Sequence, residues 1–403
     1  MSSDTGGMLA GRLVHPAGEG IVWGPGTVAR DLPGLLERTG IQWPFIVTTA
    51  SVERSGLAAR VADVIGDSLA GTFAGSKEHT PEPAVLAGAA AARAAGADGL
   101  VALGGSSVVD LTKGIAMVLA EGDDFAHLRG EGPRGRRAGE GGDRRRPRLT
   151  EPKLPQISLP TTLSGAEFTG AAGITEPATG AKEIYADAKL APRWVILDPE
   201  ITVDTPDSLW AATGMKALAD TIETQCSRRA TPLSDAVTRA AMTMLLADLG
   251  PGLAGPPPMD EAQLAARGRC QYAVGMALPQ LAMVGVGLVA GLRHQLGGAL
   301  GVGHGVASTI VLPHVLRWNA PACPDQLAAA ARAAGLGSAD ELIAAVEALT
   351  VRLGLPTRLS EVGVSDRDLP AVADHVLGDP AIRTNPRPVT GPDDVIEVLR
   401  AAL

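Results

Sequence analysis

The chain contains 403 residues, of which 45% are hydrophobic and only 3% aromatic, and it carries a formal net charge of −9. This length predicts two domains with aliphatic cores, and the negative charge argues against nucleic acid as the main partner. The N-terminal residues lack the basic end and apolar core of a signal peptide, and no apolar run reaches the roughly 20 residues that span a bilayer. The three widely spaced cysteines have no metal-binding spacing and suit a reducing compartment, so we expect a cytoplasmic protein that does not enter a membrane.

Short apolar runs alternate with alanine-rich segments through the first half of the chain. This alternation is typical of βαβ units around a parallel sheet. We therefore predict an α/β domain over residues 1–203. The predicted strands are 43–50, 99–105, 156–162 and 193–199, and the predicted helices are 83–98 and 108–120.

Residues 129–148 interrupt this pattern with a run that is rich in Arg and Gly and almost free of apolar residues. Such a composition cannot form a packed element and predicts a mobile surface loop. A polyanion-binding arm is the alternative. It is disfavoured because Glu and Asp interrupt the arginines and no aromatic residues lie among them to stack on bases.

The second half of the chain has a different texture, with Ala- and Leu-rich periodic segments separated by Gly and Pro. This periodicity predicts helices, which we place at 209–227, 233–249 and 338–354. Residues 204–403 are therefore predicted to form an all-helical domain.

A glycine turn in the first half is suited to a dinucleotide. Gly104, Gly105 and Ser106 follow a predicted buried strand and open a helix. Glycines let the backbone approach a pyrophosphate, and a helix N-terminus supplies N–H groups and a positive dipole. Tight packing between strand and helix explains such a turn equally well.

A second turn, with Thr161, Thr162 and Ser164, also follows a predicted strand. Its small hydroxyl side chains could bond a diphosphate or a ribose. The alternative is an ordinary helix N-cap, because Ser and Thr are common there.

Five separated motifs, in order along the chain, resemble the iron-type alcohol dehydrogenase superfamily, and most closely its maleylacetate reductases. The motifs are G-G-S-S-V-V-D-L-T-K (104–113), P-T-T-L-S-G-A-E-F-T (160–169), W-V-I-L-D-P-E-I-T-V-D-T-P (194–206), L-P-H-V-L-R-W-N-A-P (312–321) and N-P-R-P-V-T (385–390). Together they cover most of the length of the chain.

The resemblance implies a Rossmann-like dinucleotide-binding domain followed by a helical domain, the dehydroquinate synthase-like architecture, with a cleft between them. It also implies hydride transfer with NADH or NADPH. Thr49 occupies the place where many relatives have an Asp that bonds the adenosine ribose and repels a 2′-phosphate, which weakens the case for strict NAD preference. The positions that match cofactor contacts are Gly104, Gly105, Ser106, Thr161, Thr162 and Ser164, with Asp110 and Lys182 nearby.

Relatives that bind iron or zinc use one Asp and three His, the first two four residues apart on one helix. Here Lys216 and Asp220 stand at those two positions, Ala290 replaces the next His, and only His304 is retained. A catalytic metal generally needs three protein ligands, and a cation would face the ammonium group of Lys216. We therefore expect no metal. Maleylacetate reductases retain more of these histidines, so their specific reaction does not follow from the resemblance.

Four polar residues of the helical domain are candidate catalytic groups. Lys216 could polarise a substrate oxygen or bind a carboxylate, with Asp220 keeping it charged. His294, whose place in the family is usually near the nicotinamide, or His304 could deliver a proton. The alternative for the first pair is an ordinary exposed i,i+4 ion pair. We predict His314 to be structural.

Three functions remain open at this point. The first is a metal-independent NAD(P)H-dependent reductase, similar to maleylacetate reductases, of a small and anionic activated alkene, carbonyl or imine. The second is the same fold repurposed for non-redox acid–base chemistry, as a lyase, isomerase or cyclase, using Lys216, Asp220 and His294. The third is a non-catalytic binding relative. The intact nucleotide turns favour the first, with a small-molecule substrate and a second copy in a homodimer as expected partners.

Overall fold

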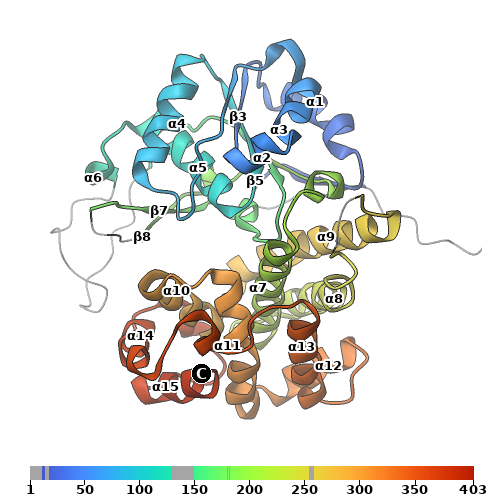
Figure 1. Cartoon of the computed structure of the whole chain (residues 1–403), viewed down its shortest axis with the longest axis vertical. Coiled ribbons are helices and arrows are strands. Elements are labelled where there is room, and N and C mark those ends of the chain that lie inside the picture. Colours follow the sequence, from blue (N-terminus) through green and yellow to red (C-terminus); the bar gives the residue numbers. More distant parts are fainter. Residues whose placement is uncertain (1–10, 14–17, 129–148, 179, 181, 254–257) are drawn as a thin grey trace, which may run out of the picture. The chain divides into compact units, whose positions relative to one another are not determined.

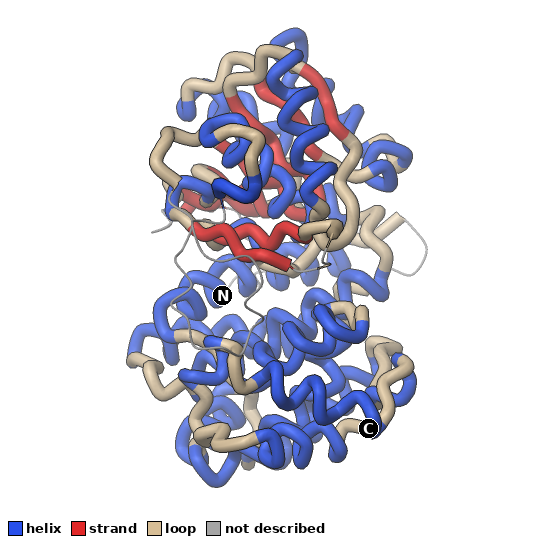
Figure 2. The backbone as a smooth tube through the Cα atoms, turned by 90° about the vertical axis from the view of Figure 1, so that its left-hand side faces the viewer, coloured by secondary structure: helices blue, strands red, loops and turns tan. Residues whose placement is uncertain are grey.

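The computed structural model describes residues 11–13, 18–128, 149–178, 180, 182–253 and 258–403, so the predicted loop at 129–148 lies outside it. The described residues form two compact units. The α/β unit contains those up to 205 together with 258–271, and the helical unit contains 206–253 and 272–403. All strands of the described chain belong to the α/β unit, whereas the helical unit consists of helices and loops (Figure 2). The predicted fold class is confirmed.

Seven strands of the α/β unit form one sheet in the order β1-β2-β9-β6-β5-β3-β4. Only β1 runs antiparallel to its neighbour. The central strands are buried along their whole length, as expected for a parallel sheet covered on both faces. The strands are β1 (Gly11–Leu13), β2 (Gly20–Trp23), β3 (Pro44–Val47), β4 (Gly71–Phe73), β5 (Gly99–Gly104), β6 (Gln156–Pro160) and β9 (Trp194–Leu197); β7 (Ala171–Thr175) and β8 (Lys182–Ala186) form a separate hairpin.

Helices cover both faces of this sheet (Figure 1). One apolar cluster contains α1 and α3, and the other contains α4 and α5. The chain leaves β3 through α3 on one face and leaves β5 through α5 on the other, so the strand order reverses between β3 and β5. Ligands of open α/β sheets bind outside the carboxyl ends of strands at such a switch point. The helices are α1 (Thr27–Thr39), α2 (Ala50–Arg54), α3 (Leu57–Ile65), α4 (Glu82–Ala94), α5 (Ser106–Glu121) and α6 (Phe125–Leu128).

The helical unit is organised around α7, which packs against α8, α10 and α11 and buries most of its residues. Polar side chains on such a helix must find partners among its neighbours. The helices are α7 (Asp207–Cys226), α8 (Pro232–Asp248), α10 (Leu288–Leu300), α11 (His304–Asn319), α12 (Pro324–Ala333), α13 (Ala339–Arg352), α14 (Leu369–Val376) and α15 (Pro392–Ala401). The long α9 (Glu261–Val284) gives its first residues to the α/β unit and the rest to the helical unit.

The segment 258–271 was expected in the helical domain but packs with the α/β unit, for a polar reason. The buried guanidinium of Arg267 donates to the carbonyl of Thr202. The amide of Gln271 donates to the carbonyls of Pro160 at 3.3 Å and Asp198 at 3.4 Å. These long side chains satisfy carbonyl groups at and just beyond the ends of β6 and β9, which the strand pairing leaves open.

The length and apolar composition of the described helices bear on whether they could enter a bilayer. No single one is long and apolar enough to cross a membrane. Only α9 and α10 taken together, across a bend of 97°, have sufficient length and apolar composition.

Candidate functional site

The glycine turn lies at the carboxyl end of β5, where α5 begins. Gly104 has φ 153°, a conformation that favours glycine, and an added Cβ there would lie 2.6 Å from Cγ2 of Val108. Gly105 is the N-cap of α5 and provides no side-chain hydrogen bond to its first turn. The N–H groups at the start of α5 therefore face the end of the sheet, where they are suited to an anion.

The second turn, 161–164, lies directly beside the glycine turn. The N–H of Thr161 donates to the carbonyl of Gly104 at 3.1 Å. An added Cβ on Gly105 would lie 3.0 Å from Cγ2 and 3.2 Å from Oγ1 of Thr162. The structure thus brings the two predicted turns, which are about 60 residues apart in the sequence, to one edge of the sheet.

Thr49 lies on the same edge, because β3 pairs directly with β5. Its hydroxyl caps α2 by accepting from the N–H of Val52 at 3.2 Å, and it lies 2.8 Å from Oγ of Ser51. A capping hydroxyl carries no charge, so it lacks the carboxylate that would repel a 2′-phosphate.

Asp110 on α5 and Lys182 on β8 lie close together. The carboxylate of Asp110 accepts from the N–H of Gly173 at 3.2 Å, and the side chain of Lys182 lies against the same glycine. Burial raises the pKa of Asp110, against the opposing charges of Lys113 and Lys182. The β7–β8 hairpin is the element that brings Lys182 to this position.

Lys113 is fully buried and has a structural role. Its ammonium group donates to the carbonyls of Ala166 at 2.7 Å and Ala171 at 2.8 Å. Burial lowers its pKa to about 8. Lys113 therefore fastens the segment that follows the second turn to α5, which helps to hold the two turns side by side.

In the helical unit, Lys216 and Asp220 form an ion pair of 2.7 Å on α7. The side chain of Lys216 is 18% exposed and that of Asp220 only 1%. An exposed surface pair, the alternative considered from the sequence, does not describe this arrangement, because a buried carboxylate needs strong compensation.

Arg293 supplies that compensation, and sequence reasoning missed it. Its guanidinium on α10 pairs with the second carboxylate oxygen of Asp220. Burial opposes ionisation, yet the charges of Arg293 and Lys216 hold the pKa of Asp220 below its usual range. The available signal was an Arg after a run of Leu, Val, Ala and Gly at the start of this helix, because such a residue needs a buried acidic partner, but this signal does not identify the partner.

The two candidate histidines lie together. Nδ1 of His294 is 2.9 Å from Oδ2 of Asp379, and Nδ1 of His304 is 3.2 Å from the carbonyl oxygen of Arg293. Their ring centroids are 5.9 Å apart and nearly perpendicular, at 87°. The structure therefore brings His294 and His304 into one cluster and adds Asp379, which the sequence analysis did not identify.

The N-terminus of α10, which carries Arg293 and His294, is anchored by two buried polar groups. The carboxylate of Glu223 accepts from the N–H groups of Val289 at 2.7 Å and Ala290 at 3.2 Å. Burial raises the pKa of Glu223 to about 7. Asn385, from the N-P-R-P-V-T motif, accepts from the N–H of Leu288 at 3.0 Å. This motif thus has a positioning role within the helical unit.

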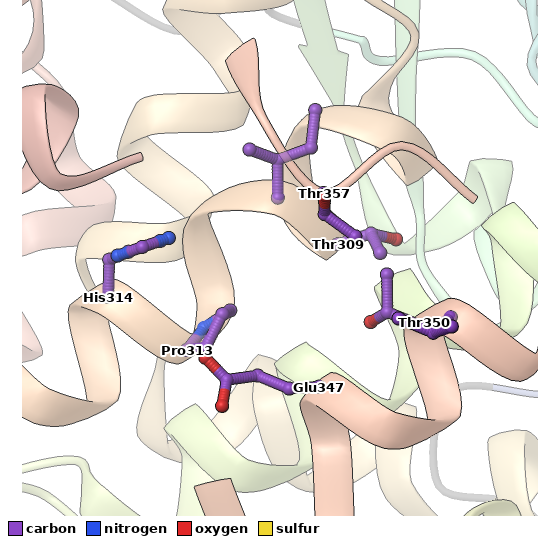
Figure 3. A pocket seen from close by; sticks show the side chains of 8 residues that line it. Thr309, Pro313, His314, Glu347, Thr350 and Thr357 are labelled. Carbon is purple, nitrogen blue, oxygen red and sulfur yellow. The ribbon is translucent and has the colours of Figure 1, made fainter. Parts of the chain in front are cut away.

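His314 lines a cavity of about 140 Å³ between α11 and α13 (Figure 3). It lies ten residues after His304 on α11, or about 15 Å along the axis at 1.5 Å per residue, so the cavity is separate from the histidine cluster. Burial and the charge of Arg317 lower the pKa of His314. The other labelled residues around the cavity are Thr309, Pro313, Glu347, Thr350 and Thr357.

An α/β unit with two polar turns at its switch point, together with a separate helical unit, defines a two-domain protein with a dinucleotide-binding type of fold. The family model described as iron-containing alcohol dehydrogenase matches residues 19–199, and that of the Fe-containing alcohol dehydrogenase family, C-terminal, matches 210–403. The chain belongs to the iron-containing alcohol dehydrogenase family and is an oxidoreductase.

Individual relatives extend over nearly the whole chain. It is 29% identical to NAD-dependent methanol dehydrogenase of Bacillus methanolicus, over 95% of this chain and 97% of the relative. It is 33% identical to 4-hydroxybutyrate dehydrogenase of Cupriavidus necator, with coverages of 89% and 91%. The crystal structure of maleylacetate reductase from Agrobacterium tumefaciens superposes with a TM-score of 0.77 at 26% identity, covering 98% of this chain and 97% of that one.

The family name implies iron, and the residues at the matching positions do not fit a metal ion. Both oxygens of Asp220 are engaged by the cations of Lys216 and Arg293, and Ala290 has no donor atom. Among the residues that the structure describes, no group of three or more His, Cys, Asp or Glu could hold a metal. Ligands in a catalytic site are normally anionic or neutral and number at least three. Metal independence itself stays a prediction.

Proposed function

We propose that this protein is a metal-independent, NAD(P)H-dependent reductase of a small activated alkene, carbonyl or imine, similar to maleylacetate reductases. The observation that carries the proposal is the pairing of the glycine turn with the 161–164 turn at the carboxyl ends of β5 and β6. A diphosphate there would meet the N–H groups of α5 and the hydroxyls of the second turn. The similarity of the chain to an NAD-dependent methanol dehydrogenase and to a maleylacetate reductase supports this assignment.

Thr49 bears on the choice of cofactor. A carboxylate at the end of β3 would repel a 2′-phosphate, and Thr49 brings only a hydroxyl that already caps α2. We therefore propose that NADPH is accepted as well as NADH.

The helical unit would supply the groups that act on the substrate. Lys216 and Arg293 place two cations around one buried carboxylate, which suits a substrate that is anionic or becomes negative as it reacts. Hydride from the dihydronicotinamide would add two electrons to the substrate, and a proton from His294 or His304 would complete the reduction. The substrate thereby gains two hydrogens, and NAD(P)⁺ remains.

The non-redox alternative assigns Asp220 an acid–base role alongside Lys216 and His294. Two cations hold the pKa of Asp220 low, so this carboxylate is a weak base and is an orienting group instead. The alternative would then have only Lys216 and His294 as acid–base groups. It would also leave the glycine turn without a role.

The deciding experiment combines nucleotide binding with metal analysis. Purified protein should bind NADH or NADPH in a fluorescence titration, should contain far less than one iron or zinc per chain, and should oxidise the bound cofactor equally well with and without EDTA when given small unsaturated keto acids, aldehydes or imines. No binding of either cofactor would favour the non-redox alternative. Activity that is lost on metal stripping and restored by re-addition would overturn metal independence.

We also propose that the protein acts on a small-molecule substrate as a homodimer in the cytoplasm. The support is the composition of the chain and the family to which it belongs. Light scattering coupled to size exclusion would test the dimer directly.

A further inference from the structure

Asp379 and His294 form a hydrogen-bonded pair whose direction can be assigned. Nδ1 of His294 lies 2.9 Å from Oδ2 of Asp379. Burial opposes ionisation of Asp379, but the hydrogen bond and charge of His294 lower its pKa. A carboxylate has no proton to give, so Nδ1 of His294 is the donor and must carry the hydrogen. In the neutral ring the other nitrogen, Nε2, is then unprotonated.

The Asp379 carboxylate is itself held in place. Its Oδ1 caps a short 3-10 helix (Pro380–Thr384) by accepting from the N–H of Ala381 at 2.9 Å, and Gln295 donates to its Oδ2 at 3.2 Å. Asp379 is only 9% exposed. A carboxylate fixed by two other donors can fix the ring that it accepts from, in position and in tautomer.

His294 combines this fixed ring with access to water. Its side chain is 44% exposed. Within the described residues, no hydrogen bond engages its Nε2. The neighbouring His304 has its Nδ1 turned to the carbonyl of Arg293, and its ring is nearly perpendicular to that of His294. The ring of His294 is thus anchored on one side only, with Nε2 on the other.

We propose that Asp379 is a positioning residue that holds His294 as the Nδ1–H tautomer, so that protons pass only through Nε2. The part of this inference that concerns proton transfer to a substrate rests on the proposed function. Nε2 takes a proton from solvent to form the imidazolium and gives it to the substrate as hydride arrives from NAD(P)H. His294 then returns to the neutral Nδ1–H form, with Asp379 ionised throughout.

The tautomer can be tested without any substrate. Protein labelled with ¹⁵N-histidine is examined by long-range ¹H–¹⁵N correlation at about pH 8, well above the usual histidine pKa of about 6.5, and the spectrum of His294→Gln assigns the signals. We expect the Nδ1–H form of His294 in the wild type. In Asp379→Ala the Nε2–H form should dominate. Asp379→Asn, which can still cap the 3-10 helix, should give a mixture, because an amide can either accept or donate.

Asp187 offers a matched control. It caps another 3-10 helix (Ala188–Leu190), in the α/β unit, by accepting from the N–H of Lys189 at 2.8 Å. It does the same capping work as Asp379 but has no histidine partner among its hydrogen bonds in the described chain. Asp187→Ala should leave the tautomer of His294 and the turnover unchanged.

The kinetic readout separates positioning from binding. General acid–base catalysis typically contributes about 10²–10⁴-fold, so losing the orientation of the acid should lower kcat at least about tenfold. KM for cofactor and substrate should stay within about twofold, because the side-chain hydrogen bonds of Asp379 go to His294, Gln295 and the backbone of Ala381. Asp379→Asn should lie between the wild type and Asp379→Ala.

Three results would overturn the proposal. They are an Nε2–H form of His294 in the wild type, an Nδ1–H form that persists in Asp379→Ala, and an Asp379→Ala variant that loses the Nδ1–H form but keeps the kcat of the wild type. A wild type that oxidises neither NADH nor NADPH with any substrate would instead overturn the proposed function. The tautomer comparison would then still decide whether Asp379 positions His294.

Discussion

The two polar turns of the α/β unit and the charged core of the helical unit are built by different physical means. At the first, the start of α5 presents backbone N–H groups, and the position of the neighbouring turn depends on the absence of a side chain at Gly105. At the second, Lys216, Asp220 and Arg293 form a network of side-chain charges. A backbone site needs particular conformations and close approach, whereas a side-chain site needs only that its charges be compensated.

This contrast bears on how freely the residues of each region can change. Adding a Cβ at Gly105 would push against Thr162 whatever the substrate, so that turn has little freedom to change. In the helical unit, by contrast, a cation at position 216 is accommodated because the buried carboxylate of Asp220 lies beside it. The charged residues of the helical unit can therefore change while the two turns of the α/β unit stay as they are.

The largest effect should come from Lys216→Met, which removes the partly exposed cation and keeps the length of the side chain. A preorganised positive group beside developing negative charge is worth on the order of 2.7–4 kcal/mol, or about 10²–10³ in rate, by analogy with single oxyanion-hole donors. We expect turnover to fall by that factor in a steady-state NAD(P)H oxidation assay. Stability should stay near normal, because Arg293 still compensates Asp220.

Lys216→Arg sharpens this test, because it keeps the charge but changes its shape. A planar guanidinium does not place its charge where a compact ammonium does, so only partial recovery is expected. If the Met variant keeps turnover within about threefold of the wild type, under roughly 0.7 kcal/mol, then Lys216 only balances the charge of Asp220.

The next effect concerns the backbone site. Gly105 has φ −88°, which valine can adopt, but its Cβ would lie 3.0 Å from Cγ2 of Thr162, so we expect Gly105→Val to weaken folding far less than it weakens nucleotide binding. Its side chain would occupy the space expected for the pyrophosphate, and we expect the Kd of NADH and NADPH to rise about a hundredfold, or about 2.7 kcal/mol. Calorimetric titration measures this directly.

Gly34 provides the control for Gly105. It lies in α1 of the same unit, and an added Cβ there would meet nothing within 4 Å. Gly34→Val should bind the cofactor like the wild type. Equal nucleotide affinity in both variants would mean that the diphosphate binds elsewhere.

The sequence was sufficient to predict helices and strands that have a clear apolar pattern of their own. All nine predicted helices and strands are confirmed, with their ends displaced by at most four residues. The elements that were not predicted include the short strands β2 and β4 and the β7–β8 hairpin. Their apolar runs are only a few residues long, and they depend on pairing with partners far along the chain, such as Trp194 opposite Gly20.

The candidate site divides in the same way. The two polar turns could be found because each follows a strand and contains a recognisable run of small residues. Arg293, Asp379 and Glu223 could not, because each acts on a partner 66 to 85 residues away that no local pattern identifies. Side-chain networks between helices are set by tertiary packing, which periodicity in one sequence does not encode.

The smallest of the three effects concerns the anchoring of α10 and follows from Glu223. Its pKa is raised by burial from 4.5 to about 7, so between these values the native state binds a proton that the unfolded state lacks. The free energy of unfolding must then fall as pH rises across this window. A single site with these two pKa values loses about 2 kcal/mol between about pH 5 and 7. Urea unfolding at several pH values should show this slope in the wild type and its loss in Glu223→Gln, whatever the constant offset of the variant.

Glu347 provides a control of opposite sign, because its hydrogen bond with Arg317 lowers its pKa. Its contribution to stability is present above pH 4.5 and disappears as pH falls through the lowered value, so Glu347→Gln should leave the slope between pH 5 and 7 unchanged. An unchanged slope in Glu223→Gln would mean that Glu223 is ionised throughout, and that the core of the helical unit compensates a third buried charge as fully as it compensates Asp220.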